Sequence, residues 1–167
     1  LRNLADTDNI KSWIRDHQPK TAVVVGAGFI GLEMAEQLHR LGMRVAVVEL
    51  ADQVLPPLDP EMAALVRLEL EQHHVELHLG DGIADLRAKN GNADAVVLAS
   101  GAVVPAELVV LGIGVRPHVQ LAREAGLDIG STGGIAVSDH MQTSDLAIYA
   151  VGDSVEYPHA VIDAPTR

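Results

Sequence analysis

Three glycines at a fixed spacing are the residues of this 167-residue sequence that most clearly predict chemistry. Gly26, Gly28 and Gly31 form a Gly-x-Gly-x-x-Gly pattern directly after the apolar run at residues 22–25. The first glycine permits a tight turn, the second lets the backbone approach a pyrophosphate, and the third lets a helix pack close to a sheet. The free N–H groups and positive dipole end of that helix attract phosphate charge. The pattern therefore predicts a dinucleotide site.

An acidic residue, Glu49, indicates which dinucleotide is bound. It ends a second apolar run, residues 45–48, at roughly the 20-residue distance beyond the glycines that such sites show. A carboxylate there can accept hydrogen bonds from both ribose hydroxyls of NAD and would repel the 2′-phosphate of NADP. Residues 50–54 contain no Arg or Lys to reverse that preference. NAD(H) is therefore favoured over the alternative, a solvated acid beside an unrelated glycine turn.

Composition and charge limit the class of protein. The length fits one domain with its own core, and the apolar runs have the length of strands. No stretch approaches the roughly 20 residues that span a bilayer, and no signal-peptide pattern opens the chain. A net charge of −11 and an aromatic content of 2% argue against nucleic acid. The absence of cysteine excludes disulfides and thiol redox chemistry within this chain. We expect a cytoplasmic protein without membrane or nucleic-acid partners.

Periodicity predicts the elements that position the glycines. A strand at about residues 21–25 leads into a helix at about residues 29–41, and Gly42 is the expected residue after that helix. The expected apolar face of the helix comprises Ile30, Met34, Leu38 and Leu41. Before the strand, Asp8 could cap a short helix that ends before Pro19 and places Ile10, Trp13 and Ile14 on one face.

The segment after Glu49 contains a second helix and a third strand. Asp59, Pro60 and Glu61 are typical of a helix start, and this helix extends to about His73. A strand follows at residues 75–79. His73, His74 and His78 lack the further ligands that zinc needs, so no metal site is expected.

Beyond residue 80 the pattern changes. Apolar runs at residues 83–88, 95–99 and 108–113 are separated by turn signals, which predicts an antiparallel meander. A short helix is expected near residues 119–125, turns at 130–134 and a strand at 135–137. A last apolar run covers residues 146–151, and residues 154–167 show no clear pattern.

Taken together, the chain resembles the middle portion of the FAD-dependent pyridine nucleotide–disulfide oxidoreductases, in the branch with NADH oxidase, NADH peroxidase and coenzyme A disulfide reductase. The stretches that carry the resemblance are VVVGAGFIGLEMAE, VLPPLDPEM, LVVLGIGVRP, GGIAVSDHMQTS and IYAVGD. It implies an α/β fold, a Rossmann-like parallel sheet flanked by helices with an antiparallel β-meander. It also implies a lead-in segment (1–20), an NAD(H)-binding domain (21–117) and a returning segment of an incomplete FAD-binding domain (118–167).

The resemblance assigns roles to ten candidate cofactor-binding residues and no catalytic or metal-binding one. Gly26, Gly28, Phe29, Ile30 and Gly31 would contact the pyrophosphate, Glu49 the ribose, Leu58 the adenosine side, Gly114 NADH by its backbone, Glu33 the nicotinamide and flavin edge, and Asp153 the ribityl–phosphate part of FAD. For Glu33 an alternative stays open, in which an exposed acid in a first helical turn only complements the helix dipole.

Three classes of function follow from these features. The first is a domain of an enzyme that passes hydride from NADH to FAD and on to a disulfide, persulfide, oxygen or peroxide. The second is a flavoprotein reductase of a carrier protein such as rubredoxin or ferredoxin, and the third is a non-catalytic NAD-sensing module. The chain by itself is expected to bind NAD(H) without turnover, because the family places its redox cysteine and most of its FAD site elsewhere. Expected partners are the remaining FAD and interface domains and, in a homo-oligomer, further copies.

Overall fold

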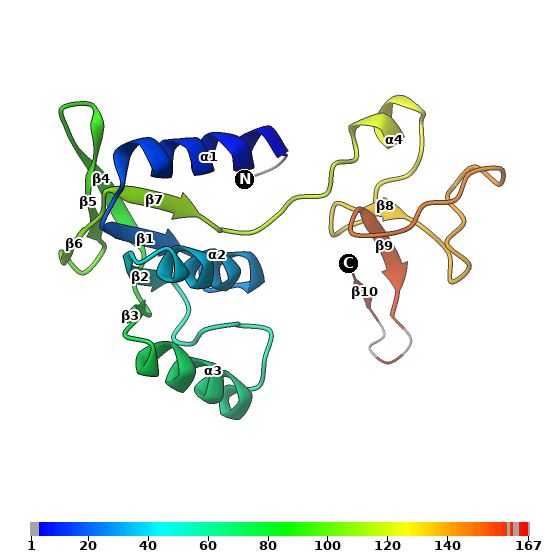
Figure 1. Ribbon diagram of the computed structural model, residues 1–167. Coiled ribbons are helices and arrows are strands. Elements are labelled where there is room, and N and C mark those ends of the chain that lie inside the picture. Colours follow the sequence, from blue (N-terminus) through cyan, green and yellow to red (C-terminus); the bar gives the residue numbers. More distant parts are fainter. Residues whose placement is uncertain (1–3, 160, 162–163, 167) are drawn as a thin grey trace. The chain divides into compact units, whose positions relative to one another are not determined.

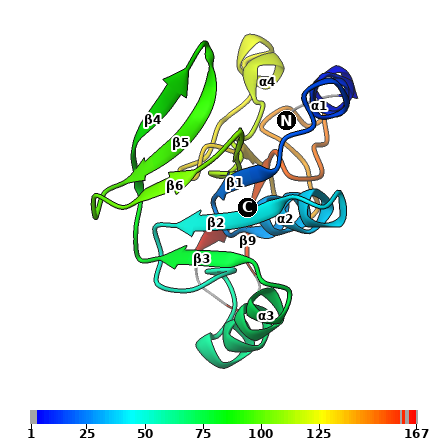
Figure 2. The same cartoon turned by 60° about the vertical axis from the view of Figure 1, so that its left-hand side comes forward.

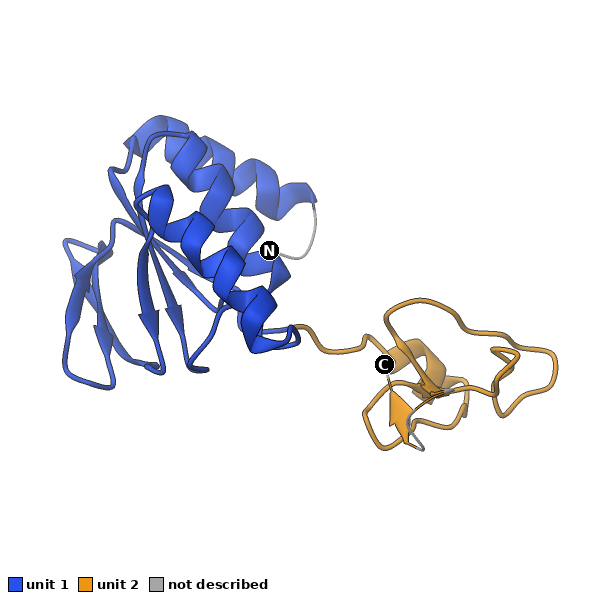
Figure 3. Cartoon of the chain, turned by 90° about the horizontal axis from the view of Figure 1, so that it is seen from below, with its two compact units in different colours: residues 1–114 blue, residues 115–167 orange. Residues whose placement is uncertain are grey.

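The computed structural model describes residues 4–159, 161 and 164–166; the other residues of the predicted lead-in and returning segments lie outside the described residues. Figure 1 labels the helices and strands. The chain divides into two compact units, residues 1–114 and residues 115–167 (Figure 3).

A four-stranded parallel sheet forms the centre of the first unit, in the order β3-β2-β1-β7. Its strands are β1 (Thr21–Val25), β2 (Arg44–Glu49), β3 (Glu76–Leu79) and β7 (Leu108–Leu111). Figure 2 shows β1, β2 and β3 side by side. β1 and β2 are buried along most of their length, as central parallel strands covered on both faces should be.

Helices cover one face of this sheet. They are α1 (Leu4–His17), α2 (Phe29–Arg40) and α3 (Pro60–Gln72). Val24 and Val47 are fully buried and share a core with Leu38 of α2. Ile14 of α1 and Leu70 of α3 pack against the same core. Because side chains alternate along a strand, the neighbouring residues of β1 and β2 face the other way.

An antiparallel meander covers the opposite face. Its strands are β4 (Ile83–Lys89), β5 (Asn92–Leu98) and β6 (Val103–Pro105). Val23 and Val48, which lie between the residues that face the helices, form a second core with Val96, Leu98 and Val104. The predicted α/β fold, a parallel sheet with helices and an antiparallel meander, is confirmed.

The prediction that the meander extends to residue 113 is wrong. Leu108–Leu111 form β7, which pairs in parallel with β1, and the third meander strand is β6. Leu108 and Val110 lie against the core under the helices, whereas Val109 lies against the core under the meander. A short apolar run does not reveal from sequence which strand it will pair with, because the pairing is set by residues far along the chain.

The expected start of α1 and part of the expected apolar face of α2 need correction, whereas the end of α1 before Pro19 and the burial of Leu38 are confirmed. α1 begins at Leu4, so Asp8 lies inside the helix and does not cap it. In α2 the buried residues are Gly31, Ala35 and Leu38, whereas Ile30 is 50% exposed and Leu41 is 64% exposed. Small residues bring α2 close to the sheet, and their low hydrophobicity hides this face from a periodicity analysis.

Two predicted helix boundaries are confirmed. Gly42 follows α2 with a φ of +84°, and its N–H donates to the carbonyl oxygen of His39 at 2.8 Å. This left-handed conformation is the usual one after a helix and favours glycine. Asp59 is the N-cap residue of α3, and Pro60 lies in its first turn.

The second unit contains α4 (Gln120–Glu124), β8 (Ile135–Ala136), β9 (Val155–Pro158) and β10 (Pro165–Thr166). β9 pairs in parallel with β8 and antiparallel with β10. β9 and β10 lie in the segment for which the sequence shows no pattern. In the apolar run at residues 146–151, Ile148 is 38% and Val151 is 76% exposed. Within the described part of the chain, no helix has the length and apolarity of a membrane span.

Candidate dinucleotide-binding site

The glycine loop joins the carboxyl end of β1 to the start of α2. Gly26 has a φ of +100°, and a Cβ added there would lie 2.8 Å from the carbonyl carbon of Gly112. A Cβ on Gly31 would overlap the carbonyl oxygen of Gly26. The packing of the chain against itself therefore requires glycine at the first and third positions of the pattern.

Gly28 differs from the other two glycines. Its φ of −76° is accessible to other residues, and a Cβ added there would meet nothing within 4 Å. The fold itself therefore does not require glycine at this position. A ligand that approaches the backbone closely does require it, because a Cβ would stand in its way. Gly28 is also the N-cap residue of α2 and provides no side-chain cap, so the first N–H groups of the helix are available to an anion. These features fit a pyrophosphate.

Two apolar side chains lie in the first turn of α2, directly after Gly28. Phe29 is 66% exposed and Ile30 is 50% exposed. Large apolar side chains at a helix start that are covered neither by the sheet nor by the meander are available to contact a ligand. The structure thus brings five pyrophosphate candidates together at one loop: Gly26, Gly28, Phe29, Ile30 and Gly31.

Glu49 ends β2 and reaches the glycine loop. Its Oε2 accepts the backbone N–H of Ala27 at 2.6 Å, and its Oε1 accepts the N–H of Ala51 at 2.9 Å. A carboxylate has about four acceptor positions, so each oxygen can also accept a ribose hydroxyl. Because its carboxylate bonds to the glycine loop, a ribose held by Glu49 would lie close to a pyrophosphate held by that loop.

The loop after β2 is attached to the same backbone. The carbonyl oxygen of Ala27 accepts the N–H of Leu55 at 2.9 Å, and Val54 and Leu55 are buried. Leu58 is half-buried, and its N–H donates to the carbonyl oxygen of Leu55 at 2.8 Å. The loop that carries the adenosine-side candidate, Leu58, is therefore held in place by Ala27. Ala27 and Leu55 carry no sequence signal that would have identified them.

The segment after β7 completes the loop's surroundings. The N–H of Gly112 donates to the carbonyl oxygen of Val25 at 2.7 Å, and a Cβ on Gly112 would lie 3.2 Å from the Cα of Gly31. Gly112 thus packs against the start of α2. Gly114, the predicted contact, is exposed with a φ of +99° and ends the first unit. The paired glycines in the LGIGVRP stretch are the signal that could have identified Gly112.

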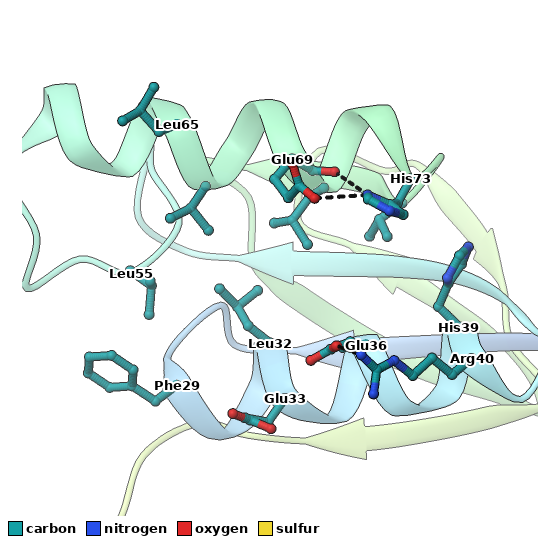
Figure 4. A pocket seen from close by; sticks show the side chains of 13 residues that line it. Phe29, Leu32, Glu33, Glu36, His39, Arg40, Leu55, Leu65, Glu69 and His73 are labelled. Atoms are coloured by element: carbon teal, nitrogen blue, oxygen red, sulfur yellow. Dashed lines mark hydrogen bonds and ion pairs between the residues drawn. The ribbon is translucent and has the colours of Figure 1, made fainter.

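Glu33 is exposed and lies beyond the first turn of α2, and that first turn contains no acidic residue. The alternative in which it is a first-turn acid that complements the dipole is therefore wrong. Glu33 and Phe29 line a groove of about 910 Å³ between α2 and α3 (Figure 4). Farther along this groove, Arg40 and Glu36 form an ion pair at 2.6 Å.

Asp153, the candidate for FAD, lies in the second unit, whereas every other candidate lies in the first. It is exposed and follows Gly152, which has a φ of +93°, in the turn before β9. The structure therefore collects the candidates of the glycine loop and β2 into one site, and it places Asp153 on a separate turn.

Comparison with known proteins establishes the family. A family model described as pyridine nucleotide-disulphide oxidoreductase matches residues 1–165. The chain belongs to this family, as its motifs predict.

Individual relatives span more than one activity. The chain is 38% identical over 154 residues to a rubredoxin-NAD(+) reductase of Ectopseudomonas oleovorans, which covers 92% of this chain and 39% of that protein. It is 41% identical over 157 residues to an NADH oxidase of Methanocaldococcus jannaschii, covering 93% and 34%. The chain thus spans about two fifths or less of the length of these relatives.

Two solved structures of oxidoreductases also match nearly the whole of this chain. Reduced CoADR-RHD of Bacillus anthracis matches with a TM-score of 0.91 and 46% identity, over 99% of this chain and 29% of that one. A ferredoxin reductase of Rhodopseudomonas palustris matches with a TM-score of 0.89 and 34% identity, over 100% and 41%.

Proposed function

We propose that this chain is the NAD(H)-binding part of a flavin-dependent oxidoreductase that transfers hydride from NADH to FAD and on to a disulfide, persulfide, oxygen or peroxide. The observation that carries the proposal is the open backbone at Gly28. Gly28 lies at a helix start that has no side-chain cap, and the backbone N–H of the preceding residue, Ala27, donates a hydrogen bond to the carboxylate of Glu49. Family membership supports the flavin half of the proposal.

The residues of the chain would bind and orient the nicotinamide cofactor. Backbone N–H groups at the start of α2 would hold the pyrophosphate, with Gly28 leaving room for its approach. Glu49 would accept hydrogen bonds from the ribose hydroxyls, Leu58 would lie on the adenosine side, and Gly114 would lie close to NADH by its backbone. The flavin, when bound, supplies the acceptor for hydride, and the share of the protein is positioning.

The preference for NADH over NADPH rests on the charge at the end of β2. The 2′-phosphate of NADPH would meet the carboxylate of Glu49, and residues 50–54 offer no cation to balance it. The negative charges of the 2′-phosphate and of Glu49 would repel each other, whereas the ribose hydroxyls of NADH can donate hydrogen bonds to the same carboxylate oxygens.

A second candidate function is reduction of a carrier protein by the same NADH-to-FAD route. It is favoured by the similarity to the rubredoxin-NAD(+) reductase and the ferredoxin reductase. In either case, Asp153 would contact the ribityl–phosphate part of FAD, and Glu33 would face the nicotinamide and flavin edge. The partners of this domain would be the FAD and interface domains of a cytoplasmic enzyme that assembles as a homo-oligomer.

Calorimetric titration of the chain with NADH and with NADPH tests the proposal. We expect tighter binding of NADH, and Glu49→Ala should weaken it by about 1–3 kcal/mol through the loss of charge-assisted hydrogen bonds. Glu124→Ala, which removes the same charge from the exposed surface of α4, is the matched control and should leave binding unchanged. NADPH binding as tightly as NADH would contradict the assignment.

A further inference from the structure

A buried carboxylate in the second unit has no role in the dinucleotide site. Glu156 of β9 is 7% exposed, and it is the only charged side chain among the buried residues that the structure describes. Burying a carboxylate is unfavourable unless hydrogen bonds replace its water. The partners of Glu156 therefore indicate what the side chain is for.

Its hydrogen-bond partners come from one turn. Oε1 accepts the N–H of Ser131 at 3.1 Å and the Ser131 hydroxyl at 3.4 Å. Oε2 accepts the N–H of Thr132 and, at 2.6 Å, the Thr132 hydroxyl. Hydrogen bonds from Thr132 and Ser131 hold the pKa of Glu156 below its ordinary value, against the opposing effect of burial.

The glycines of this turn leave room for the carboxylate. A Cβ on Gly130 would overlap the carboxyl group of Glu156, and a Cβ on Gly134 would lie 2.7 Å from the carbonyl carbon of Val155. The N–H of Gly130 donates to the carbonyl oxygen of Gly134 at 2.8 Å, which closes the turn. The glycine-rich segment 130–134 thus encloses the carboxylate of Glu156, a residue of the same unit.

Glu156 also connects this turn to Asp153. The N–H of Val155 donates to the carbonyl oxygen of Gly152 at 3.3 Å, which closes the turn that holds Asp153. Ile135 of β8 donates its N–H to the carbonyl oxygen of Ser154 at 2.8 Å. The turn at residues 130–134 therefore holds the side chain of Glu156. The backbone of β9, to which Glu156 belongs, holds the end of the Gly152–Asp153 turn through the bond from Val155.

We propose that Glu156 is a positioning residue, whose seat in the turn at residues 130–134 holds the Gly152–Asp153 turn in the shape that presents Asp153 to a flavin. The ligand named here rests on the proposed function, whereas the coupling between the two turns depends only on the contacts above.

Amide NMR of the whole chain tests the coupling. In Glu156→Gln, the neutral amide replaces one accepting oxygen with a donor that faces N–H groups. We expect shifted resonances at Gly152 and Asp153, as well as at Ser131 and Thr132. Hydrogen exchange should become about tenfold faster at the amides that donate the bonds described above, those of Ser131, Thr132 and Val155. Amides of α4 and of the first unit should keep their protection. Glu124→Gln, in the same unit, is the control and should move none of these resonances.

A milder variant covers the case in which Glu156→Gln unfolds the second unit. Thr132→Val removes only the 2.6 Å hydroxyl bond to Oε2 and should shift Gly152 and Asp153 in the same direction by a smaller amount. Unchanged Gly152 and Asp153 resonances in the folded variants would overturn the proposal. Failure of the wild-type chain to bind NADH would instead refute the proposed function and leave this result standing.

Discussion

Replacing two glycines of the same loop should separate folding from binding. In Gly31→Ala the new Cβ overlaps the carbonyl oxygen of Gly26 and lies 3.0 Å from its carbon. The obstacle is backbone, and Gly26 cannot easily retreat because it packs on Gly112. Overpacking of this kind costs about 1–3 kcal/mol, from which the better helix propensity of alanine removes up to about 1 kcal/mol. Because the new Cβ would overlap the oxygen outright, we expect a cost at the upper end of this range and a net loss of about 2 kcal/mol, together with weaker NADH binding.

Gly28→Ala should have the opposite profile. Its backbone suits alanine and the space around it is open, so the folded state gains no clash. Alanine restricts the unfolded chain, which favours folding by about 0.4–1 kcal/mol, but it is a poorer N-cap residue than glycine, so we expect little net change in stability. The methyl group would, however, occupy the space through which a pyrophosphate approaches, and NADH affinity should fall by about tenfold or more, equivalent to ~1.4 kcal/mol.

Urea unfolding and calorimetry measure the two effects. The fluorescence of Trp13, the only tryptophan, reports on the first unit, and titration with NADH reports on the site. Each variant serves as the control for the other, since both add one methyl group to the same loop. Undiminished NADH affinity in Gly28→Ala would show that no ligand approaches there, and an unchanged unfolding midpoint in Gly31→Ala would contradict the close packing.

Three further predictions concern stability. Leu38→Ala removes a fully buried side chain and should destabilise the first unit by about 2–5 kcal/mol in the Trp13 urea assay; a loss below 1 kcal/mol would mean the core is looser than described. Gly42→Ala places alanine at a φ of +84° and should lower stability by about 1 kcal/mol, an effect that an unchanged midpoint would disprove. Because the folded pKa of Glu156 is lowered, its contribution to the second unit is present above the unfolded pKa and lost as pH falls through the folded pKa. Amide exchange in that unit, corrected for its intrinsic pH dependence, should therefore accelerate below about pH 4, and Glu156→Gln should remove the change.

Most of the strand–helix–strand unit could be predicted because its signals are local. The glycine spacing, Gly42 after α2 and Pro60 at the start of α3 each act on backbone conformation within a few residues. The same local chemistry, glycines followed by Glu49, predicted the class of ligand. These features depend on residue type and spacing, which a sequence displays directly.

Tertiary structure decided the features that depend on distant neighbours. β7 pairs with β1 in the parallel sheet, and because β1 lies far away in the sequence, this pairing could not be predicted from the local pattern. Of the buried face of α2, the sequence predicted Leu38, but it did not reveal the small residues Gly31 and Ala35, whose hydrophobicity is low.

The site shows the same division. Sequence alone determined that Glu49 is an acid at the end of a strand after a glycine pattern. Only the folded chain showed that its carboxylate bonds Ala27, that Gly112 packs on the helix start, and that Glu156 is enclosed by the turn at residues 130–134. Hydrogen bonds and close backbone contacts between segments distant in the sequence leave no periodic trace, so they could be found only where the chain had brought those segments together.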